Sequence, residues 1–299
     1  MPSFFPRSSL LLALLVFAGL NSSCLVRSSK PIPAPLISQT ATLEELLAKL
    51  QRLGEVRTMK ATAELRLSAE TEDRMQVKEF PNAPGFIIAR RPAEIRTIAQ
   101  VPVVRTVAFQ MASDGQTFQV YLPSRKRFFV GDTAVDRPSE KRIENIRPNH
   151  ILDAILIETP QDDEIAVLEN EIEGLTPYQV VLLIRTGGPK APKLARKFWF
   201  SRETLELSHM QIFDDLGNTA TLARYEQWAE QNSLPYPTIV SVMRPADGYS
   251  LRIQFLQPGL NETVPEDSFV LETPKGVTVE RLGEAEAEQA NAHAESRKP

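Results

Sequence analysis

The apolar positions of this chain follow two different periods, and the first of them predicts a helix. From Thr42 to Leu53 the leucines recur three and four residues apart, which places them on one stripe of a helix. Thr42 and Glu45 have the spacing of a capping box at its start, and Gly54 is expected to end it. Because only one face is apolar, we expect this helix to lie on another apolar surface.

From Lys60 onward apolar and polar residues alternate, which predicts strands with one buried face. Turn sequences such as Ser113-Asp114-Gly115 separate the alternating runs. A second helix is expected at 149–157, where the apolar spacing returns to that of a helix. We expect strands at 60–70, 85–90, 94–100, 103–112, 116–122, 127–131, 164–173, 178–186, 194–201, 205–213, 219–230, 238–244 and 249–257.

The order of these elements predicts a mainly β protein of the α+β class. Strands and helices do not alternate as they do in parallel nucleotide-binding sheets. A long antiparallel meander has two free edges, and closing it or curling it into a half-barrel protects them. The two helices are then placed to act as plugs or lids on the open side.

The N-terminal sequence predicts export and anchoring. Arg7 precedes an apolar run that ends at Leu20, and small residues then lead to Cys24, the only cysteine of the chain. This order is typical of a signal peptide, and the run is too short for a bilayer, which needs about 20 residues. We therefore predict a lipoprotein signal peptide at residues 1–23 and a lipid on Cys24. The alternative is an ordinary secretory signal with an incidental cysteine, because Asn21 stands where a lipobox has an aliphatic residue.

Two further segments differ in composition from the predicted domain at residues 42–282. Residues 24–41 contain Pro31, Pro33 and Pro35, and this Pro-rich stretch predicts an extended tether. Residues 283–299 are rich in Ala and Glu, which predicts a flexible tail.

Composition and motifs argue against several classes of function. A net charge of -4 argues against a nucleic-acid partner, and a single cysteine excludes an internal disulfide. His150, His209 and His293 lie far apart, without the spacing of metal ligands. The sequence also has no nucleophile elbow, phosphate-binding loop or zinc-protease motif. We therefore predict no enzyme, no cofactor and no metal site.

Two stretches of the chain resemble a known family. The first begins with G-F-I-I-A-R-R-P at Gly85 and ends at Gly131, and the second is P-E-D-S-F-V-L-E-T-P-K-G-V-T-V, from Pro265 to Val279. They are similar to the outer-membrane lipoprotein carriers and receptors of the LolA/LolB-like superfamily, and the resemblance covers most of residues 42–282. It implies a half-open antiparallel β-barrel of about 11 strands, with a helical lid over an apolar cavity for acyl chains.

The resemblance also implies roles for particular residues. Arg91 falls where the family has an arginine that hydrogen-bonds the lid backbone in the closed state, and a surface arginine is the alternative. Val101, Pro102, Val103 and Val104 fall where the membrane-anchored receptor projects an apolar loop. No glycine follows Pro102 here, and Val103 replaces the expected leucine. The alternative is that these valines pack in the core as strand residues.

The family's cavity is lined by inward-facing apolar and aromatic side chains. Alternation identifies candidates for that lining, each of which is equally compatible with a filled core. The candidates are Leu65, Leu67, Ile88, Ile95, Phe109, Phe118, Val120, Leu183, Phe198 and Phe200.

These observations predict a monomeric, lipid-anchored protein of the bacterial cell envelope. Its expected ligand is an acylated lipoprotein or a lipid, bound for transfer or localisation. An Asp directly after the lipidated cysteine favours retention of a lipoprotein in the inner membrane, and this chain has Leu25 at that position. We therefore expect the protein to be anchored in the outer membrane, facing the periplasm. The alternative is a non-enzymatic scaffolding lipoprotein with the same fold and no working cavity.

Overall fold

The fold is taken from a computed structural model, which describes residues 38–71, 76–133, 146–188 and 191–282. All of these residues belong to one compact unit, Ile37–Pro299. The predicted signal peptide, Cys24, most of the tether and the tail lie outside the described residues. Among the helices that are described, none combines the length and the apolar character needed to cross a membrane.

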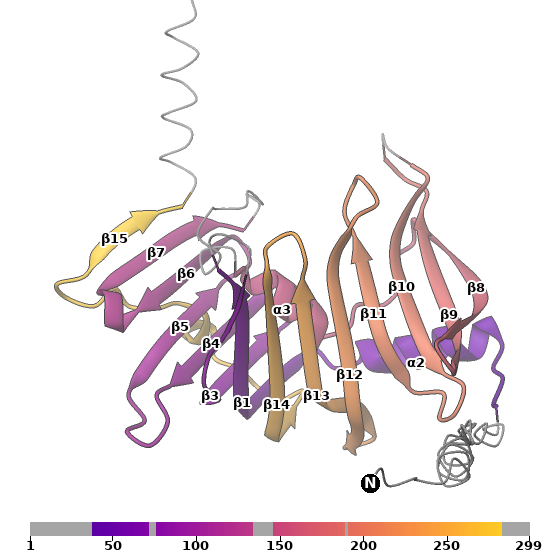
Figure 1. Cartoon of the computed structure of the whole chain (residues 1–299), viewed down its shortest axis with the longest axis horizontal. Coiled ribbons are helices and arrows are strands. Elements are labelled where there is room, and N and C mark those ends of the chain that lie inside the picture. The colour runs from indigo at the N-terminus through magenta and orange to yellow at the C-terminus, as the bar shows by residue number, and fades with distance from the viewer. Residues whose placement is uncertain (1–37, 72–75, 134–145, 189–190, 283–299) are drawn as a thin grey trace, which may run out of the picture. The chain divides into compact units, whose positions relative to one another are not determined.

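One large sheet forms the body of this unit (Figure 1). In the described residues it contains fifteen strands: β1 (Thr58–Glu70), β2 (Val77–Glu79), β3 (Ala83–Arg90), β4 (Glu94–Gln100), β5 (Val107–Ser113), β6 (Thr117–Leu122), β7 (Arg127–Asp132), β8 (Glu164–Glu173), β9 (Thr176–Arg185), β10 (Lys193–Ser201), β11 (Leu207–Phe213), β12 (Thr219–Gln231), β13 (Leu234–Arg244), β14 (Tyr249–Leu260) and β15 (Thr278–Arg281).

Most neighbouring strands are consecutive in the chain and antiparallel. The order across the sheet is β15-β7-β6-β5-β4-β3-β1-β14-β13-β12-β11-β10-β9-β8, with β2 paired to β1. The pairing of β1 with β14 therefore joins an early and a late strand in the middle of the sheet. Among the described strands only β15 pairs in parallel, with β7. Over the described strands the two ends of the sheet do not pair, as in a half-open barrel.

Two α-helices of the described residues lie against this sheet: α2 (Leu43–Gly54), which contacts β8 and β13, and α3 (Pro148–Ile155), which contacts β4, β5 and β13 (Figure 1). Two short 3-10 helices, η1 (Pro123–Arg125) and η3 (Glu266–Phe269), complete the helical elements of this part of the chain.

The predicted capping box starts α2. The Thr42 hydroxyl accepts a hydrogen bond from the Glu45 N–H at 3.2 Å, and the Glu45 carboxylate accepts one from the Thr42 N–H at 2.7 Å. Gly54 is the last helical residue rather than the residue beyond the end. A Cβ on Gly54 would lie 2.2 Å from the Cγ2 of Thr159, so any larger residue there would force the Thr159 side chain to move.

The core lies between the two helices and one face of the sheet. Along β1 the alternation of the sequence becomes an alternation of burial, with Ala61, Ala63 and Leu65 facing the core. Leu46 and Leu50 of α2 are fully buried in the same cluster. The apolar stripe of the sequence is therefore the face that packs on the sheet.

The predicted mainly β class and half-open barrel are confirmed, but the sheet has fifteen strands in the described residues where about 11 were expected. β2 and β15 were missed because three and four residues are too short to show alternation. β13 begins at Leu234, before the predicted start at residue 238, although it contains Pro235 and Pro237. The prolines are tolerated because β13 pairs there with β12 alone, so no ladder hydrogen bond is lost on the other side.

The predicted strand at 103–112 is wrong at its start. β5 begins at Val107, and the residues before it form a turn. The Arg105 N–H donates to the Val101 carbonyl at 3.0 Å, and the Val101 N–H donates to the Thr106 carbonyl at 2.8 Å. These local bonds close the β4–β5 hairpin and leave the valines between them outside the ladder.

Candidate functional site

An apolar pocket of about 410 Å³ opens on the core face of the sheet, beside α3. Its wall is built by strands that are neighbours in the sheet, in the order β6-β5-β4-β3-β1-β14, because the residues that face the core on each strand point to the same side. The apolar residues that line it include Leu65, Leu67, Phe80, Ala99, Phe109, Leu122, Ile151 and Leu251. We call this site the apolar pocket.

A few polar groups are placed within this apolar surface. The Thr97 side chain lines the pocket, is 3% exposed, and its hydroxyl has no hydrogen-bond partner among the described residues. Gln100 and Ser124 also line the pocket, as does Tyr249 of β14. An apolar lining with few polar groups is typical of small-molecule sites, where the polar groups fix the ligand's orientation.

The turn between β4 and β5 carries exposed apolar residues at the edge of the apolar pocket. Val101 and Pro102 belong to the pocket lining. Val103 is 94% exposed and Val104 is 64% exposed. Val103 also has a φ of 70°, a conformation that β-branched residues rarely adopt. The alternative of core packing does not agree with this geometry, and we call residues 101–105 the valine loop.

Arg91 connects the end of β3 to the helix beside the apolar pocket. Its Nη1 lies 3.4 Å from Oδ1 of Asp153 on α3. Its backbone N–H donates to the Arg57 carbonyl at 2.9 Å, which fixes the base of the side chain. The resemblance implied a bond to the backbone of the lid, and the observed partner is instead a side chain of α3.

A buried polar cluster lies under the start of α3. His150 Nδ1 lies 3.4 Å from the Tyr249 hydroxyl and 3.9 Å from Oδ2 of Asp247. The Arg244 Nε donates to the same Asp247 oxygen at 2.7 Å. Burial lowers the pKa of His150 well below its usual value, and the charges of Arg244 and Arg147 lower it further. His150 is therefore a neutral residue between α3 and the sheet, which its position at a helix start did not predict.

Apart from Ile88, the residues that the sequence suggested as cavity lining lie in three different parts of the structure. Leu65, Leu67 and Phe109 line the apolar pocket. Ile95, Phe118, Val120, Leu183 and Phe198 are buried in the core outside that lining. Phe200 lines a second pocket.

Ile88 was assigned to the wrong face of its strand. It pairs with Lys60 of β1 and Arg96 of β4, whose side chains point to the other side of the sheet from the core. Ile87 and Ala89 of the same strand are fully buried instead. Where two consecutive residues such as Ile87 and Ile88 are both apolar, the sequence does not show which of them faces the core. A shift of one residue moves every side chain of the strand to the opposite face of the sheet.

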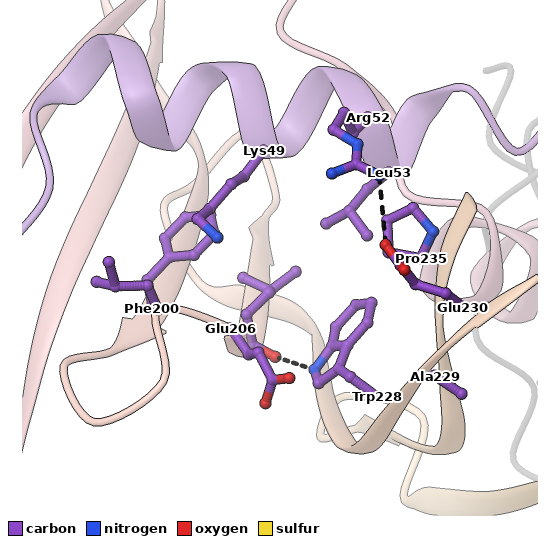
Figure 2. Close-up of a pocket in the computed structure, with 11 residues that line it drawn as sticks. Lys49, Arg52, Leu53, Phe200, Glu206, Trp228, Ala229, Glu230 and Pro235 are labelled. Atoms are coloured by element: carbon purple, nitrogen blue, oxygen red, sulfur yellow. Dashed lines mark hydrogen bonds and ion pairs between the residues drawn. The ribbon is translucent and has the colours of Figure 1, made fainter. Parts of the chain in front are cut away.

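The second pocket, of about 430 Å³, lies between α2 and the strands β10 to β13 (Figure 2). Its floor is apolar and aromatic, and charged side chains surround it. The lining includes Lys49, Arg52, Leu53, Phe200, Leu205, Glu206, Leu207, Trp228, Glu230 and Pro235. We call it the amphipathic pocket. No group of three or more His, Cys, Asp or Glu side chains in the described residues is arranged to hold a metal ion.

Comparisons with known proteins give similarity only at the level of three-dimensional structure. No protein-family model matches the sequence. No curated protein matches it either. A solved LolA superfamily protein from Nitrosomonas europaea is similar with a TM-score of 0.46 and 14% identity, over 78% of this chain and 99% of that one.

Two further solved structures are similar to a comparable extent. A DUF1329 family protein from Desulfovibrio piger has a TM-score of 0.49 and 11% identity, over 76% of this chain and 95% of that one. An outer membrane lipoprotein-sorting protein domain from Vibrio parahaemolyticus has a TM-score of 0.46 and 12% identity, over 75% and 94%. The neighbours thus include the superfamily that the two sequence stretches resemble, and the likeness concerns the outline of the fold.

Proposed function

We propose that this chain is a lipid-anchored protein of the bacterial cell envelope that binds an acylated lipoprotein or a lipid in the apolar pocket. The bound ligand would be transferred or kept in place by relative affinity, without a covalent step. The anchor would be the lipid on Cys24, and the expected location is the outer membrane, facing the periplasm.

The apolar pocket is the observation that carries this proposal. A volume of about 410 Å³ lies within the range of small-molecule sites, which is about 300–1,000 Å³. Each methylene that moves from water into such a pocket contributes about 0.8 kcal/mol. Side chains in a filled core would leave no such space, so the free volume favours a ligand over the scaffolding alternative.

The valine loop supports a membrane or an acylated partner as the source of the ligand. Val103 and Val104 expose apolar surface to water, which is unfavourable unless another apolar surface covers it. Val101 and Pro102 continue that surface into the apolar pocket. An acyl chain leaving a bilayer would thus meet a continuous apolar path.

Lipid analysis tests the proposal directly. The full-length chain is extracted with a mild detergent and its organic extract is analysed by mass spectrometry, while a polarity-sensitive apolar dye reports binding in parallel. We expect co-purifying acyl lipid and a saturable dye signal that free fatty acid displaces. A folded protein that carries no lipid and binds no dye would overturn the carrier function and leave the scaffolding alternative.

Anchoring needs its own test, because Cys24 lies outside the described residues. Replacing Cys24 by Ser should move the protein from the membrane fraction to the soluble envelope fraction. An unmodified chain that is already soluble would contradict lipidation without affecting the ligand proposal.

A further inference from the structure

The amphipathic pocket differs in chemistry from the apolar pocket and uses other elements of the fold. Lys49, Arg52 and Leu53 reach it from α2, Trp228 reaches it from β12, and Glu206 reaches it from the turn between β10 and β11 (Figure 2). Its floor therefore combines aromatic and aliphatic surface, while both signs of charge stand at its rim.

Two contacts hold the Trp228 side chain in the floor of this pocket. The Trp228 indole N–H donates to the Leu207 carbonyl at 2.9 Å, and the Tyr225 ring lies 5.9 Å from the Trp228 ring. The indole is thus fixed with its polar edge already bonded. Its face, together with Phe200, remains as an aromatic surface that lines the pocket.

The four charged residues of the rim fall into two groups. Arg52 lies 3.4 Å from the Glu230 carboxylate and donates to the Ser233 carbonyl at 2.8 Å, so these two charges are paired. Within the described part of the chain, the side chains of Lys49 and Glu206 form no hydrogen bond or ion pair. One cation on the helix side and one carboxylate on the strand side are thus available to a ligand.

We infer that the amphipathic pocket binds a zwitterionic amphiphile, a molecule with one ammonium group, one anionic oxygen group and an apolar part. Lys49 would hold the anionic oxygens, and Glu206 with the face of Trp228 would hold the ammonium group. The apolar part would cover Phe200 and Leu53. A purely anionic ligand would meet the Glu206 carboxylate, and a purely cationic one would meet Lys49, so the net-neutral ligand is favoured.

Both a phosphoethanolamine lipid and an aromatic amino acid have this chemistry, and binding assays can separate them. The chain contains two tryptophans, so Trp199→Phe leaves Trp228 as the only tryptophan reporter in the full-length protein. The probes are short-chain phosphatidylethanolamine, phosphatidylglycerol and diacylglycerol below their aggregation limits, together with phenylalanine. If Trp199→Phe does not fold, calorimetry on the Leu67→Glu variant gives the same comparison, because the charge in its apolar pocket opposes lipid binding there.

We expect saturable binding of phosphatidylethanolamine that is at least tenfold tighter than that of phosphatidylglycerol or diacylglycerol. Lys49→Gln and Glu206→Gln should each weaken it about tenfold, and Glu206→Gln should narrow the preference over phosphatidylglycerol. Glu203→Gln is the matched control, because Glu203 is exposed near Glu206 but outside the pocket lining. Equal or tighter binding of phenylalanine would support the zwitterionic site and assign it to an amino acid.

Equal affinity for all three lipids would overturn the inference, since the rim charges would then contribute nothing. No response of Trp228 to any probe would overturn it as well. Leu67→Glu, which places a charge in the apolar pocket, should leave this binding unchanged. The outcome is therefore separate from the test of the proposed function.

Discussion

Arg91 and Asp153 form the ion pair that joins the end of β3 to α3, with 3.4 Å between Nη1 and Oδ1. The Arg91 side chain is mostly buried, whereas the Asp153 side chain is 41% exposed. Ion pairs with this much exposure contribute about 1 kcal/mol or less. The link between the sheet and the helix beside the apolar pocket is thus weak, which suits a contact that opens and closes.

Arg91→Gln should accelerate ligand exchange more than it changes stability. Removing the pair frees α3 at this end, so we expect release of a bound apolar dye to become a few times faster, with a loss of about 1 kcal/mol in the free energy of unfolding. Stopped-flow dye displacement measures the rate. Arg57→Gln is the control, because Arg57 directly precedes β1, the strand that pairs with β3, and its side chain is exposed. Unchanged release in Arg91→Gln would contradict a gating role.

The two faces of the sheet offer a matched pair for locating the ligand. Leu67→Glu places a carboxylate in the apolar pocket and should reduce dye binding at least tenfold, because burying an unpaired charge is unfavourable. Ile88→Glu changes an apolar residue of the neighbouring strand β3 on the other face and should leave binding within twofold. Equilibrium fluorescence titration, with circular dichroism to confirm folding, makes the comparison. Equal losses in both variants would place the ligand elsewhere.

The sequence predicted the elements well because their signals are local. The capping box of Thr42 and Glu45 and the alternation of β1 depend on residues a few positions apart. It was harder to predict which side chains of a strand face the core, as Ile88 shows. That choice depends on the pairing of Ile88 with Lys60 and Arg96 on the neighbouring strands, which are distant in sequence or separated by a turn.

The sites depend even more on long-range contacts. The cluster around His150 joins residues about one hundred positions apart, and the amphipathic pocket joins α2 to strands about 150 positions or more later. Neither has a motif. Free volume, moreover, is a property of packing, so alternation predicted which residues are buried but not where the core leaves space.

Val103→Gly should stabilise the protein while weakening its attachment to membranes. Glycine adopts a φ of 70° without strain, so we expect a gain of about 1 kcal/mol in the free energy of unfolding. Loss of an exposed valine should reduce co-sedimentation of the chain with liposomes several-fold, since burying that side chain contributes about 1.5 kcal/mol. Urea unfolding and sedimentation measure the two effects.

Leu216→Gly provides the matched control for the valine loop. Leu216 is 83% exposed in the turn between β11 and β12, at a position without a positive φ. This substitution should affect neither liposome binding nor strain. If it lowers liposome binding as much as Val103→Gly does, the valine loop has no special part in membrane contact.

Thr97→Val should stabilise the empty protein and weaken binding of ligands that carry a carbonyl. The Thr97 hydroxyl is buried without a partner in the described residues, and an isosteric methyl group removes that penalty, which is about 1–3 kcal/mol. We expect the variant to retain affinity for a long-chain alkane but to lose affinity for the matching methyl ester. Thr97→Ser, which keeps the hydroxyl, is the control. A variant less stable than the original chain would mean that the hydroxyl is satisfied.

His150 should make the stability of the domain depend on pH between about 7.5 and 5.5, which is above the pH range in which carboxylates ordinarily titrate. Burial, with Arg244 and Arg147 nearby, holds the pKa of His150 well below the value of about 6.5 that it has in an unfolded chain. Burial also lowers the pKa of His209 to about 4. As the pH falls through 6.5, the unfolded chain binds protons that the native chain does not. Stability is therefore lost on acidification, by about 1.4 kcal/mol for each histidine between pH 7.5 and 5.5.

Replacing each histidine separates its effect on stability from its effect on the site. His150→Gln and His209→Gln should each remove about half of the pH-dependent loss, measured by urea unfolding at pH 7.5 and 5.5. Of the two histidines, only His150 lies between α3 and the β13–β14 hairpin that carries Asp247 and Tyr249. Only His150 therefore gains a proton at pH 5.5 when α3 opens, and this proton uptake favours the open state of the helix beside the apolar pocket. Dye release should therefore accelerate at pH 5.5 in the original chain and in His209→Gln, but not in His150→Gln. The same acceleration in all three proteins would show that the pH dependence of the site comes from other groups.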